Sequence, residues 1–270
     1  MGSKRVVITG ASSGIGAALA EMHARDGWDV VMVNRSAESS RPAVEQIVST
    51  HPDVDVDVVE ADLADHDAIA RAAEELRSLG SVDRFVNNAG VLLGERVMSR
   101  HGVEMHAQVN TLAPYLFGRL VAPSMTGGLM AVITTSGIDR AKTLAVDELA
   151  DPPTFKKLFG PYVQSKLAAS ALMPALAREY PEVTFRSAEP GAVKTPMTSG
   201  DGMPGWLVPI RNLFFSTPEK GAERIYEALD AEAPNGSYMR KGKPRAVPGD
   251  AGSQAVQEAL VEWCRATTGT

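Results

Sequence analysis

The chain has 270 residues, 44% hydrophobic and 22% charged, which is ordinary for a globular protein with a sizeable core. A net charge of -6 gives no support for a nucleic-acid partner, and a single cysteine, Cys264, excludes an intrachain disulfide. Strand-like residues begin at Val6, leaving no room for a signal peptide, and no apolar run approaches the ~20 residues of a membrane helix, so we expect a soluble, cytoplasmic protein.

Strands and helices alternate through the first half of the chain. Apolar runs predict buried strands over residues 5–9 and 29–33, an alternating run predicts a strand over 54–59, and residues 85–86 open a fourth. Helical patterns lie between them. They cover residues 14–25, which Gly27 ends, and then 37–49 and 68–79.

The second half continues the alternation. A long helix is expected over 103–121, interrupted or kinked near Pro114, and a fifth strand over 129–135. The helix that carries Tyr162 runs to about residue 180, bent at Pro174, and a sixth strand covers 183–187. Such alternation implies right-handed βαβ units and a parallel sheet covered on both faces. We therefore predict an α/β fold: one doubly wound (Rossmann) domain over residues 1–270, in three α/β/α layers.

Two segments depart from this alternation. Residues 137–160 form a long connection of mixed polarity, which we interpret as an insertion before the Tyr162 helix. Residues 197–217 contain Trp206, Leu207, Phe214 and Phe215 among several glycines. Because long loops in compact domains are functional or disordered, we predict that this second, apolar segment is a lid over a lipophilic pocket. The alternative is a helix packed permanently on the core.

A glycine-rich turn joins the first strand to the first helix. Its spacing, with glycines at 10, 14 and 16, differs from the G-x-G-x-x-G fingerprint, but its place in the first βα turn favours nucleotide binding. The glycines permit close backbone approach, and the helix N-terminus offers N–H groups to a pyrophosphate. The predicted cofactor-binding residues of this turn are Gly10, Ser12, Ser13, Gly14, Ile15 and Gly16.

The end of the second strand predicts the form of the nucleotide. An acidic residue there would bind the ribose hydroxyls of NAD, but the sequence reads Asn34-Arg35-Ser36. Arg35 can pair with a 2′-phosphate, and Ser36 can add a hydrogen bond. We therefore predict NADP (NADPH) as the cofactor. The alternative is that Arg35 is a solvated surface residue.

Tyr162 and Lys166 lie four residues apart, on one face of the predicted helix. A free tyrosine has a pKa near 10, and a nearby ammonium favours the phenolate and lowers that pKa. The pair therefore indicates a proton donor or acceptor. Tyrosine and lysine at this spacing are common on solvated faces, and it is the glycine turn upstream that makes the pair specific.

These motifs, in this order, resemble the classical short-chain dehydrogenase/reductase family over nearly the whole chain. Asp62-Leu63 is similar to the adenine contact of the family, Asn87-Asn88-Ala89-Gly90 to its NNAG motif along the cofactor, and Pro190-Gly191-Ala192-Val193-Lys194-Thr195 to the segment that positions the nicotinamide. The resemblance therefore adds these cofactor-binding residues: Asp62, Leu63, Asn88, Ala89, Gly90, Tyr162, Lys166, Pro190, Gly191, Val193 and Thr195.

The resemblance also implies a catalytic tetrad of Asn110, Ser136, Tyr162 and Lys166. Tyr162 would protonate a carbonyl oxygen, Ser136 orient it, Lys166 lower the pKa of the tyrosine and bind the ribose, and Asn110 hold a water relay. The sequence reads Thr134-Thr135-Ser136 where the family usually has two serines, so Thr135 is an alternative for the hydroxyl role. No metal site is predicted.

The separation of 26 residues between Ser136 and Tyr162 (162 − 136) exceeds that of compact family members. With Gly94-Glu95-Arg96 and Ser165-Lys166-Leu167-Ala168, it resembles the retinol-dehydrogenase-like branch. The resemblance implies an NADP-dependent oxidoreductase that interconverts an alcohol with a ketone or aldehyde, as a homodimer or homotetramer. The apolar lid favours a lipophilic or polycyclic substrate. Alternatives are a catalytically silent NAD(P)-binding regulatory or scaffold protein, and an enzyme that uses the nucleotide for epimerisation or dehydration.

Overall fold

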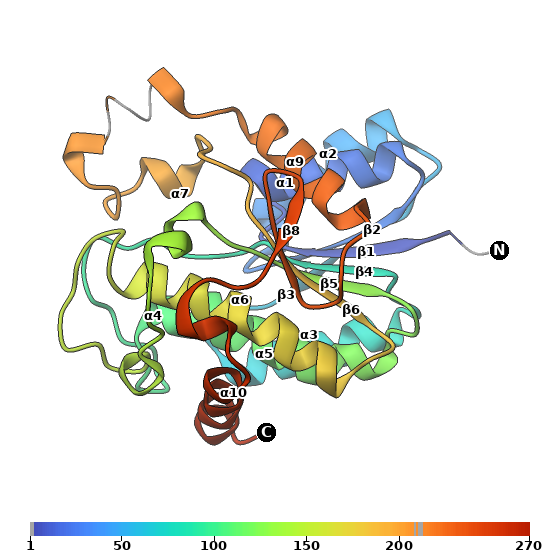
Figure 1. The fold of residues 1–270 in the computed structure, drawn as a ribbon. Helices are drawn as coiled ribbons and strands as arrows, with labels where there is room; N and C mark the ends of the chain where they lie inside the picture. The colour runs from blue at the N-terminus through green and yellow to red at the C-terminus, as the bar shows by residue number, and fades with distance from the viewer. Residues whose placement is uncertain (1–2, 208, 210–212) are drawn as a thin grey trace.

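Strands and helices alternate along the chain in the computed structural model, which describes residues 3–207, 209 and 213–270 (Figure 1). The strands are β1 (Arg5–Thr9), β2 (Asp29–Asn34), β3 (Val56–Glu60), β4 (Arg84–Asn87), β5 (Leu129–Ile133), β6 (Thr184–Ala188), β7 (Ser237–Arg240) and β8 (Lys243–Arg245). The main helices are α1 (Gly14–Arg25), α2 (Ala37–Thr50), α3 (His66–Ser78), α5 (Ala113–Val121), α6 (Pro161–Glu179), α9 (Pro218–Asp230) and α10 (Gln254–Thr268). Short helical segments are α4 (Met105–Ala107), η1 (Gln108–Leu112), η2 (Ala122–Ser124), η3 (Ser136–Arg140), η4 (Val146–Glu148), α7 (Pro196–Ser199), η5 (Gly205–Leu207) and η6 (Gly249–Gly252).

All the described strands belong to one sheet, in the order β3-β2-β1-β4-β5-β6-β7-β8. Neighbouring strands are parallel except β7 and β8, which form an antiparallel pair. The order reverses direction between β1 and β4, which is the switch point where doubly wound sheets bind ligands. The central strands are apolar on both faces because helices cover both, and this explains why they read as continuous apolar runs.

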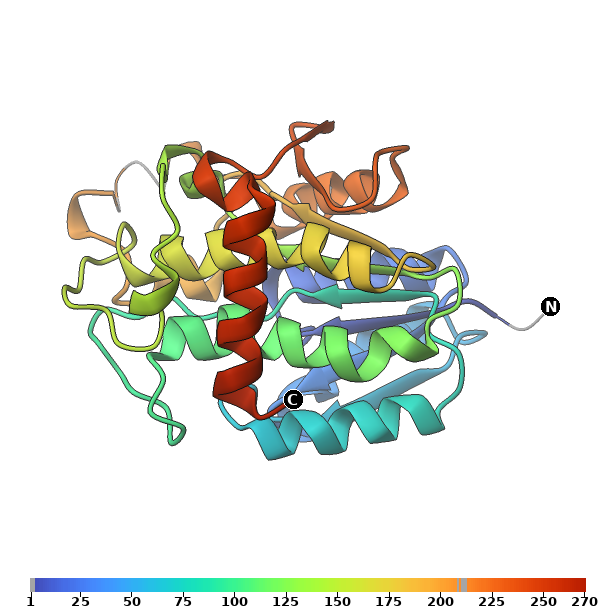
Figure 2. The same cartoon turned by 60° about the horizontal axis from the view of Figure 1, so that its bottom comes forward.

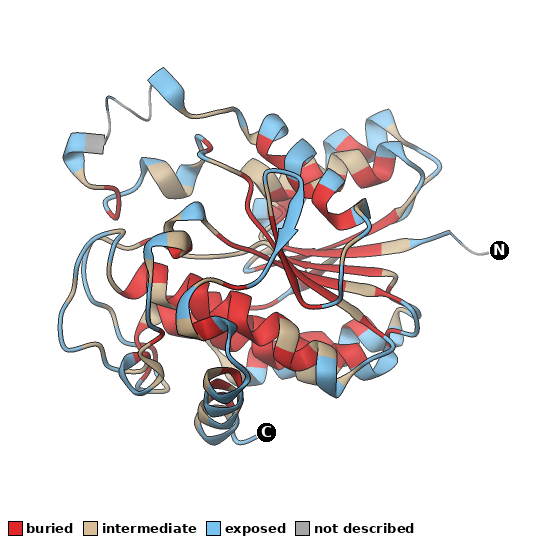
Figure 3. Cartoon of the chain, viewed as in Figure 1, coloured by how far each residue is buried: buried red, intermediate tan, exposed pale blue. Residues whose placement is uncertain are grey.

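Helices lie on both faces of this sheet, with a hydrophobic core on each side (Figures 1 and 3). Helices α1, α2 and α9 cover one face, and α3, α5 and α6 cover the other. Helix α10 lies across α6 on its outer side (Figure 2). Helix α6 is therefore covered by the sheet on one side and by α10 on the other, which accounts for its nearly continuous run of buried residues. The predicted three-layer Rossmann fold is confirmed.

Several predicted boundaries need correction. The expected helix over 103–121 is instead α4, the π-helical turn η1 and α5. The interruption expected near Pro114 is the π turn that immediately precedes it, and Pro114 lies in the first turn of α5. The third strand ends at Glu60 and the fifth at Ile133. Elements α9, β7, β8 and α10 lie in a part of the chain, residues 218–270, to which no element was assigned from the sequence.

The predicted lid over 197–217 contains α7 and η5, while residues 208 and 210–212 lie outside the described part of the chain. Trp206 is 64% exposed and Phe214 77% exposed, whereas Phe215 packs against the core. The predicted insertion over 137–160 contains η4 and leads into α6. The lid and insertion roles stay predictions. Among the described helices, none is both long and apolar enough to cross a membrane.

Candidate active site

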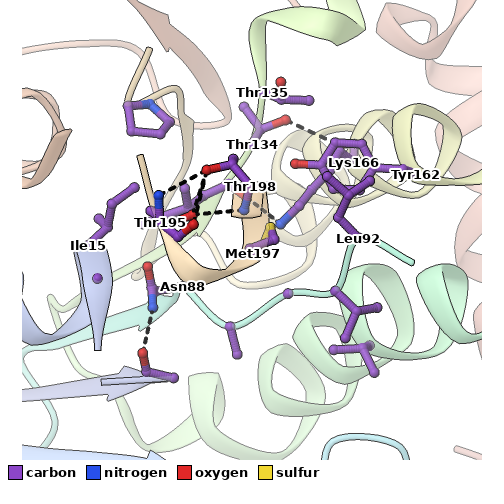
Figure 4. A pocket seen from close by; sticks show the side chains of 18 of the residues that line it. Ile15, Asn88, Leu92, Thr134, Thr135, Tyr162, Lys166, Thr195, Met197 and Thr198 are labelled. Carbon is purple, nitrogen blue, oxygen red and sulfur yellow. Dashed lines mark hydrogen bonds between the residues drawn. The ribbon is translucent and has the colours of Figure 1, made fainter. Parts of the chain in front are cut away.

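A cavity of about 1550 Å³ opens where the parallel strands reach their carboxyl ends. Its walls come from the turns that follow β1, β2, β3, β4, β5 and β6, and from the first turns of α6. It therefore brings together the glycine turn, the NNAG turn, the Tyr162–Lys166 pair and the Pro190 segment, which are far apart in the sequence (Figure 4). This is the position that the doubly wound topology dictates for a ligand.

The glycine turn fits closely against the NNAG turn. Asn88 donates hydrogen bonds from Nδ2 to the carbonyl oxygens of Thr9 (2.9 Å) and Gly10 (3.1 Å). Gly10 has φ +67°, and a Cβ on Gly16 would lie 2.4 Å from Nδ2 of Asn88, so neither position accepts a side chain without a shift. These glycines keep backbone at the cavity wall, which is the cradle that a dinucleotide pyrophosphate requires.

The predicted binding site for the adenosine part of the cofactor lies just after the carboxyl ends of β2 and β3. Arg35 is exposed and borders the cavity, as do Asp62 and the buried Leu63. The Ser36 side chain accepts a hydrogen bond from the Ser39 backbone N–H and so caps α2, which leaves its own hydroxyl proton free to donate elsewhere. An exposed guanidinium beside this turn suits a phosphate group.

Tyr162 and Lys166 lie in the first turns of α6, both buried and both bordering the cavity (Figure 4). Lys166 donates a hydrogen bond from Nζ to the Ile133 carbonyl oxygen, at 2.8 Å. A Cβ on Gly90 would lie 3.1 Å from that Nζ, so the NNAG turn passes directly over the ammonium. A side chain at position 90 would therefore crowd the ammonium and would displace it by a few tenths of an ångström.

Burial raises the pKa of Tyr162 to about 12 and lowers the pKa of Lys166 to about 8. Burial therefore outweighs the lowering of the Tyr162 pKa that was expected from Lys166. Desolvation disfavours the charged form of both groups, and the ammonium is directed at the carbonyl oxygen of Ile133. Tyr162 is thus a protonated phenol at neutral pH, and Lys166 is mostly charged.

Two hydroxyls lie at the end of β5. The Ser136 side chain is exposed, begins η3 and hydrogen-bonds Glu189, where it partly offsets the burial that raises the pKa of that carboxyl group. Thr135 precedes it in extended conformation and accepts a hydrogen bond from the Gly137 N–H at 3.3 Å. Both residues border the cavity, so the structure keeps both as candidates for the same role.

Asn110 is fully buried in the π-helical turn η1. Its Nδ2 donates to the Val91 carbonyl (3.1 Å) and to Oγ of Ser165 (3.0 Å), and its Oδ1 accepts from the Val91 N–H (2.8 Å). The side chain therefore ties the irregular segment that follows the NNAG turn to α6. Its predicted water-holding role stays a prediction.

The segment after β6 borders the cavity, and Figure 4 shows Thr195, Met197 and Thr198 between Asn88 and the Tyr162–Lys166 pair. Gly191 has φ +79°, Val193 is buried, and Thr195 caps α7 through a reciprocal pair of hydrogen bonds with Thr198. This rigid turn keeps Pro190, Gly191, Val193 and Thr195 at the cavity wall. The predicted nicotinamide-positioning segment therefore borders the same cavity as the Tyr162–Lys166 pair.

Part of the wall was not predicted from the sequence. Apolar side chains border the cavity beyond the tetrad, namely Leu92, Leu93, Val97, Met105, Leu158, Phe159, Met203 and Phe215. Asp139 and Arg240 form an ion pair at the same wall. The sequence offered one signal for this apolar wall, which is the apolar run after the NNAG motif. The other lining residues come from loops that are separate in the sequence.

Comparison with known proteins agrees with this geometry. The family model described as short chain dehydrogenase matches residues 4–146, which is more than half of the chain. The chain belongs to the short-chain dehydrogenase family. A Streptomyces protein named "Putative daunorubicin C-13 ketoreductase DnrU" is 29% identical over 98% of this chain and 93% of its own length.

Human retinol dehydrogenase 14 is 30% identical over 88% of this chain and 78% of its own length, which confirms the resemblance to the retinol-dehydrogenase-like branch. An alcohol dehydrogenase from Thermococcus sibiricus, solved with 5-hydroxy-NADP, superposes with a TM-score of 0.67 at 27% identity. That superposition covers 86% of this chain and 92% of the other. The chain is thus a short-chain dehydrogenase with Rossmann architecture.

Proposed function

We propose that this short-chain dehydrogenase is an NADPH-dependent carbonyl reductase that converts a lipophilic ketone or aldehyde to its alcohol. The observation that carries the proposal is a buried tyrosine and lysine at one cavity wall, facing a glycine cradle and an exposed Arg35 along the same cavity. NADPH supplies hydride to the carbonyl carbon when it is bound. The proposal draws further support from the NADP analogue bound to the related alcohol dehydrogenase.

Tyr162 is the proton donor in this scheme. Because burial holds its pKa near 12, the phenol keeps its proton at neutral pH and gives it to the far more basic alkoxide oxygen as that charge develops. At neutral pH the tyrosine therefore starts the reduction in the protonated form that a proton donor needs. The Lys166 ammonium stabilises the phenolate left behind.

The carbonyl oxygen needs a second hydrogen bond, from Thr135 or Ser136. We place Thr135 first because its hydroxyl oxygen accepts from the Gly137 N–H, which leaves its own proton free to donate from a half-buried position at the cavity wall. Thr135→Val should then lower kcat by about 10²-fold and Ser136→Ala by less than threefold, since a lost oxyanion donor typically costs 10²–10³ in kcat. The reverse order would return the role to Ser136.

The wall beside Tyr162 indicates the substrate class. Met105, Leu158 and Phe159 border the cavity with Leu92, so the space next to the proton donor is apolar. Such a pocket favours bulky hydrophobic carbonyl compounds over small polar ones. The related ketoreductase and retinol dehydrogenase carry names of polycyclic or isoprenoid compounds, which supports this choice.

The test begins with titration of the purified protein by NADPH and NADH, followed by nicotinamide fluorescence. We expect tighter binding of NADPH, and then NADPH oxidation that depends on an added aromatic ketone or long-chain aldehyde. Tighter binding of NADH would overturn the choice of cofactor. NADPH binding without turnover across a broad carbonyl panel would contradict the reductase and favour the silent nucleotide-binding alternative.

A further inference from the structure

A buried acid and a buried histidine lie behind the cavity wall, where the proposed chemistry does not use them. Glu104 is 0% exposed and His106 is 1% exposed, and neither borders the cavity. One carboxylate oxygen of Glu104 lies 2.8 Å from Nδ1 of His106, and the other accepts the His106 backbone N–H at 2.9 Å. Buried ionisable groups are costly unless they are fully hydrogen-bonded, so their presence here needs a reason.

The contacts of His106 fix its protonation. Its Nε2 lies 2.9 Å from the Leu93 backbone nitrogen, which can only donate, so Nε2 must be the acceptor. Nδ1 therefore carries the hydrogen and donates it to Glu104. The carboxylate selects the tautomer, and the tautomer selects the Leu93 contact, so the two residues work as one unit.

The Glu104–His106 unit contacts Tyr162 on one side and the Leu92–Leu93 part of the cavity wall on the other. The His106 ring packs edge-on against the Tyr162 ring, with centroids 6.0 Å apart and planes at 75°. Leu92 and Leu93 line the cavity on the other side of the hydrogen bond. Glu104 also donates its backbone N–H to the Ala150 carbonyl at 2.7 Å, which links the unit to the predicted insertion.

We propose that Glu104 and His106 form a positioning pair that sets the distance between the Tyr162 phenol and the Leu92–Leu93 wall. The inference rests on the proposed reductase function, because the wall and the phenol together decide where a carbonyl oxygen can lie. A displacement of about 1 Å at such a site can cost 10²-fold in rate. The pair acts through Tyr162 and Leu93 and has no contact with the reacting atoms.

Three substitutions separate the two contacts of the pair. Glu104→Gln keeps one acceptor oxygen but turns an amide N–H against the second donor, so it removes one of the two hydrogen bonds that hold His106, with almost no change in shape. His106→Asn keeps a donor for Glu104 but cannot reach Leu93. His106→Gln places its amide oxygen near the Nε2 position and so can still accept from Leu93. Glu148→Gln, an exposed glutamate in η4, is the matched control.

The readouts are kcat and KM for a carbonyl substrate at saturating NADPH, the Kd for NADPH, and hydrogen exchange of the peptide that contains the Leu93 amide. We expect Glu104→Gln and His106→Asn to lower kcat by about 10–100-fold, with NADPH Kd changed less than twofold and faster exchange at Leu93. His106→Gln should recover most of the kcat and of the slow exchange, and Glu148→Gln should match the wild type.

Unchanged kcat and unchanged exchange in Glu104→Gln and His106→Asn would overturn the inference. Equal losses in the two His106 variants, together with weaker NADPH binding, would also overturn it, because they indicate general loss of structure. An inactive wild type would contradict the proposed function instead. In that case the exchange rates alone would still decide whether the pair holds Leu93.

Discussion

The parallel sheet holds buried cations near both of its ends, and two of them, Arg84 and Lys166, are held in different ways. At the amino end, Arg84 donates to Nε2 of His23 at 3.0 Å, pairs with Asp230, and lies with its guanidinium carbon 4.7 Å from the Trp28 ring centroid and 5.6 Å from that of Tyr226. At the carboxyl end, Lys166 donates to a main-chain carbonyl, and burial lowers its pKa to about 8.

The difference separates structural charge from functional charge. Arg84 has a carboxylate partner and aromatic faces, which offset the cost of removing it from water. Lys166 has no carboxylate partner among the described residues, and its pKa of about 8 lies close to neutral pH. Changes at the amino end should therefore alter stability, whereas changes at the carboxyl end should alter turnover.

The largest effect is expected at the carboxyl end. Tyr162→Phe removes the proton donor and keeps the ring, so kcat should fall by about 10³-fold while the NADPH Kd changes less than twofold. Steady-state kinetics and fluorescence titration measure the two quantities. Tyr180→Phe, on a tyrosine at the far end of α6, is the control and should keep full activity. Unchanged turnover in Tyr162→Phe would show that Tyr162 is not the proton donor.

The corresponding change at the amino end is Arg84→Met. It leaves His23 without its donor and Asp230 without its cation, so the free energy of unfolding should fall by about 3 kcal/mol. Urea denaturation measures this loss, and NADPH binding of the folded variant should be unchanged. Arg25→Met removes an exposed arginine and should cost less than about 0.5 kcal/mol. If both variants lost the same stability, the amino-end cluster would have no special role.

A pH series sharpens the comparison further. Burial lowers the pKa of His23 to about 4 from its usual 6.5, with the Leu19 carbonyl opposing and Arg84 adding to that shift. The unfolded chain therefore binds more protons below pH 6.5, and folding stability should fall as the pH drops from 6.5 to 4, by about 3 kcal/mol in total. His23→Gln should remove this slope from the urea unfolding curves. An equally steep slope in that variant would assign acid unfolding to other groups.

Lys166 should respond in the opposite pH range. Its ammonium is charged below about pH 8, so kcat for carbonyl reduction should fall as the pH rises from 8 to 10, by about tenfold per pH unit. Stability should rise over the same range, because the unfolded lysine, with a pKa of 10.5, still binds a proton. Parallel kinetics and unfolding experiments distinguish the two effects. A flat kcat profile up to pH 10 would contradict the need for the ammonium.

The elements predicted correctly are those whose signal is local. The apolar runs of β1 and β2 and the turn with Gly10 and Gly14 can be read from adjacent residues, and the fold follows from their alternation. The π-helical turn η1 could not be read in this way, because Asn110 is placed there by contacts with Val91 and Ser165, residues distant in sequence.

The same limit applies to the site chemistry. The spacing of Tyr162 and Lys166 indicates a coupled pair, but the direction of the tyrosine pKa depends on burial, which comes from the tertiary structure. Glu104 and His106 are only two residues apart, yet their importance comes from Leu93 and Tyr162, which the fold brings against them. Short sequence motifs can therefore identify candidate catalytic residues, but the pKa values of those residues depend on contacts that only the folded chain makes.

The smallest effect is expected where a cation at the carboxyl end is exposed to water. Arg35 borders the cavity but is solvated, so its pairing with a 2′-phosphate contributes less than a buried pair would. Arg35→Ala should weaken NADPH binding by about tenfold and leave NADH binding unchanged, because NADH lacks that phosphate. Arg41→Ala, on the exposed face of α2, is the control and should bind both nucleotides as the wild type does. Equal NADPH affinity in Arg35→Ala and the wild type would contradict the NADP assignment and leave Tyr162 and Lys166 unaffected, since nucleotide choice and proton transfer belong to opposite ends of the cavity.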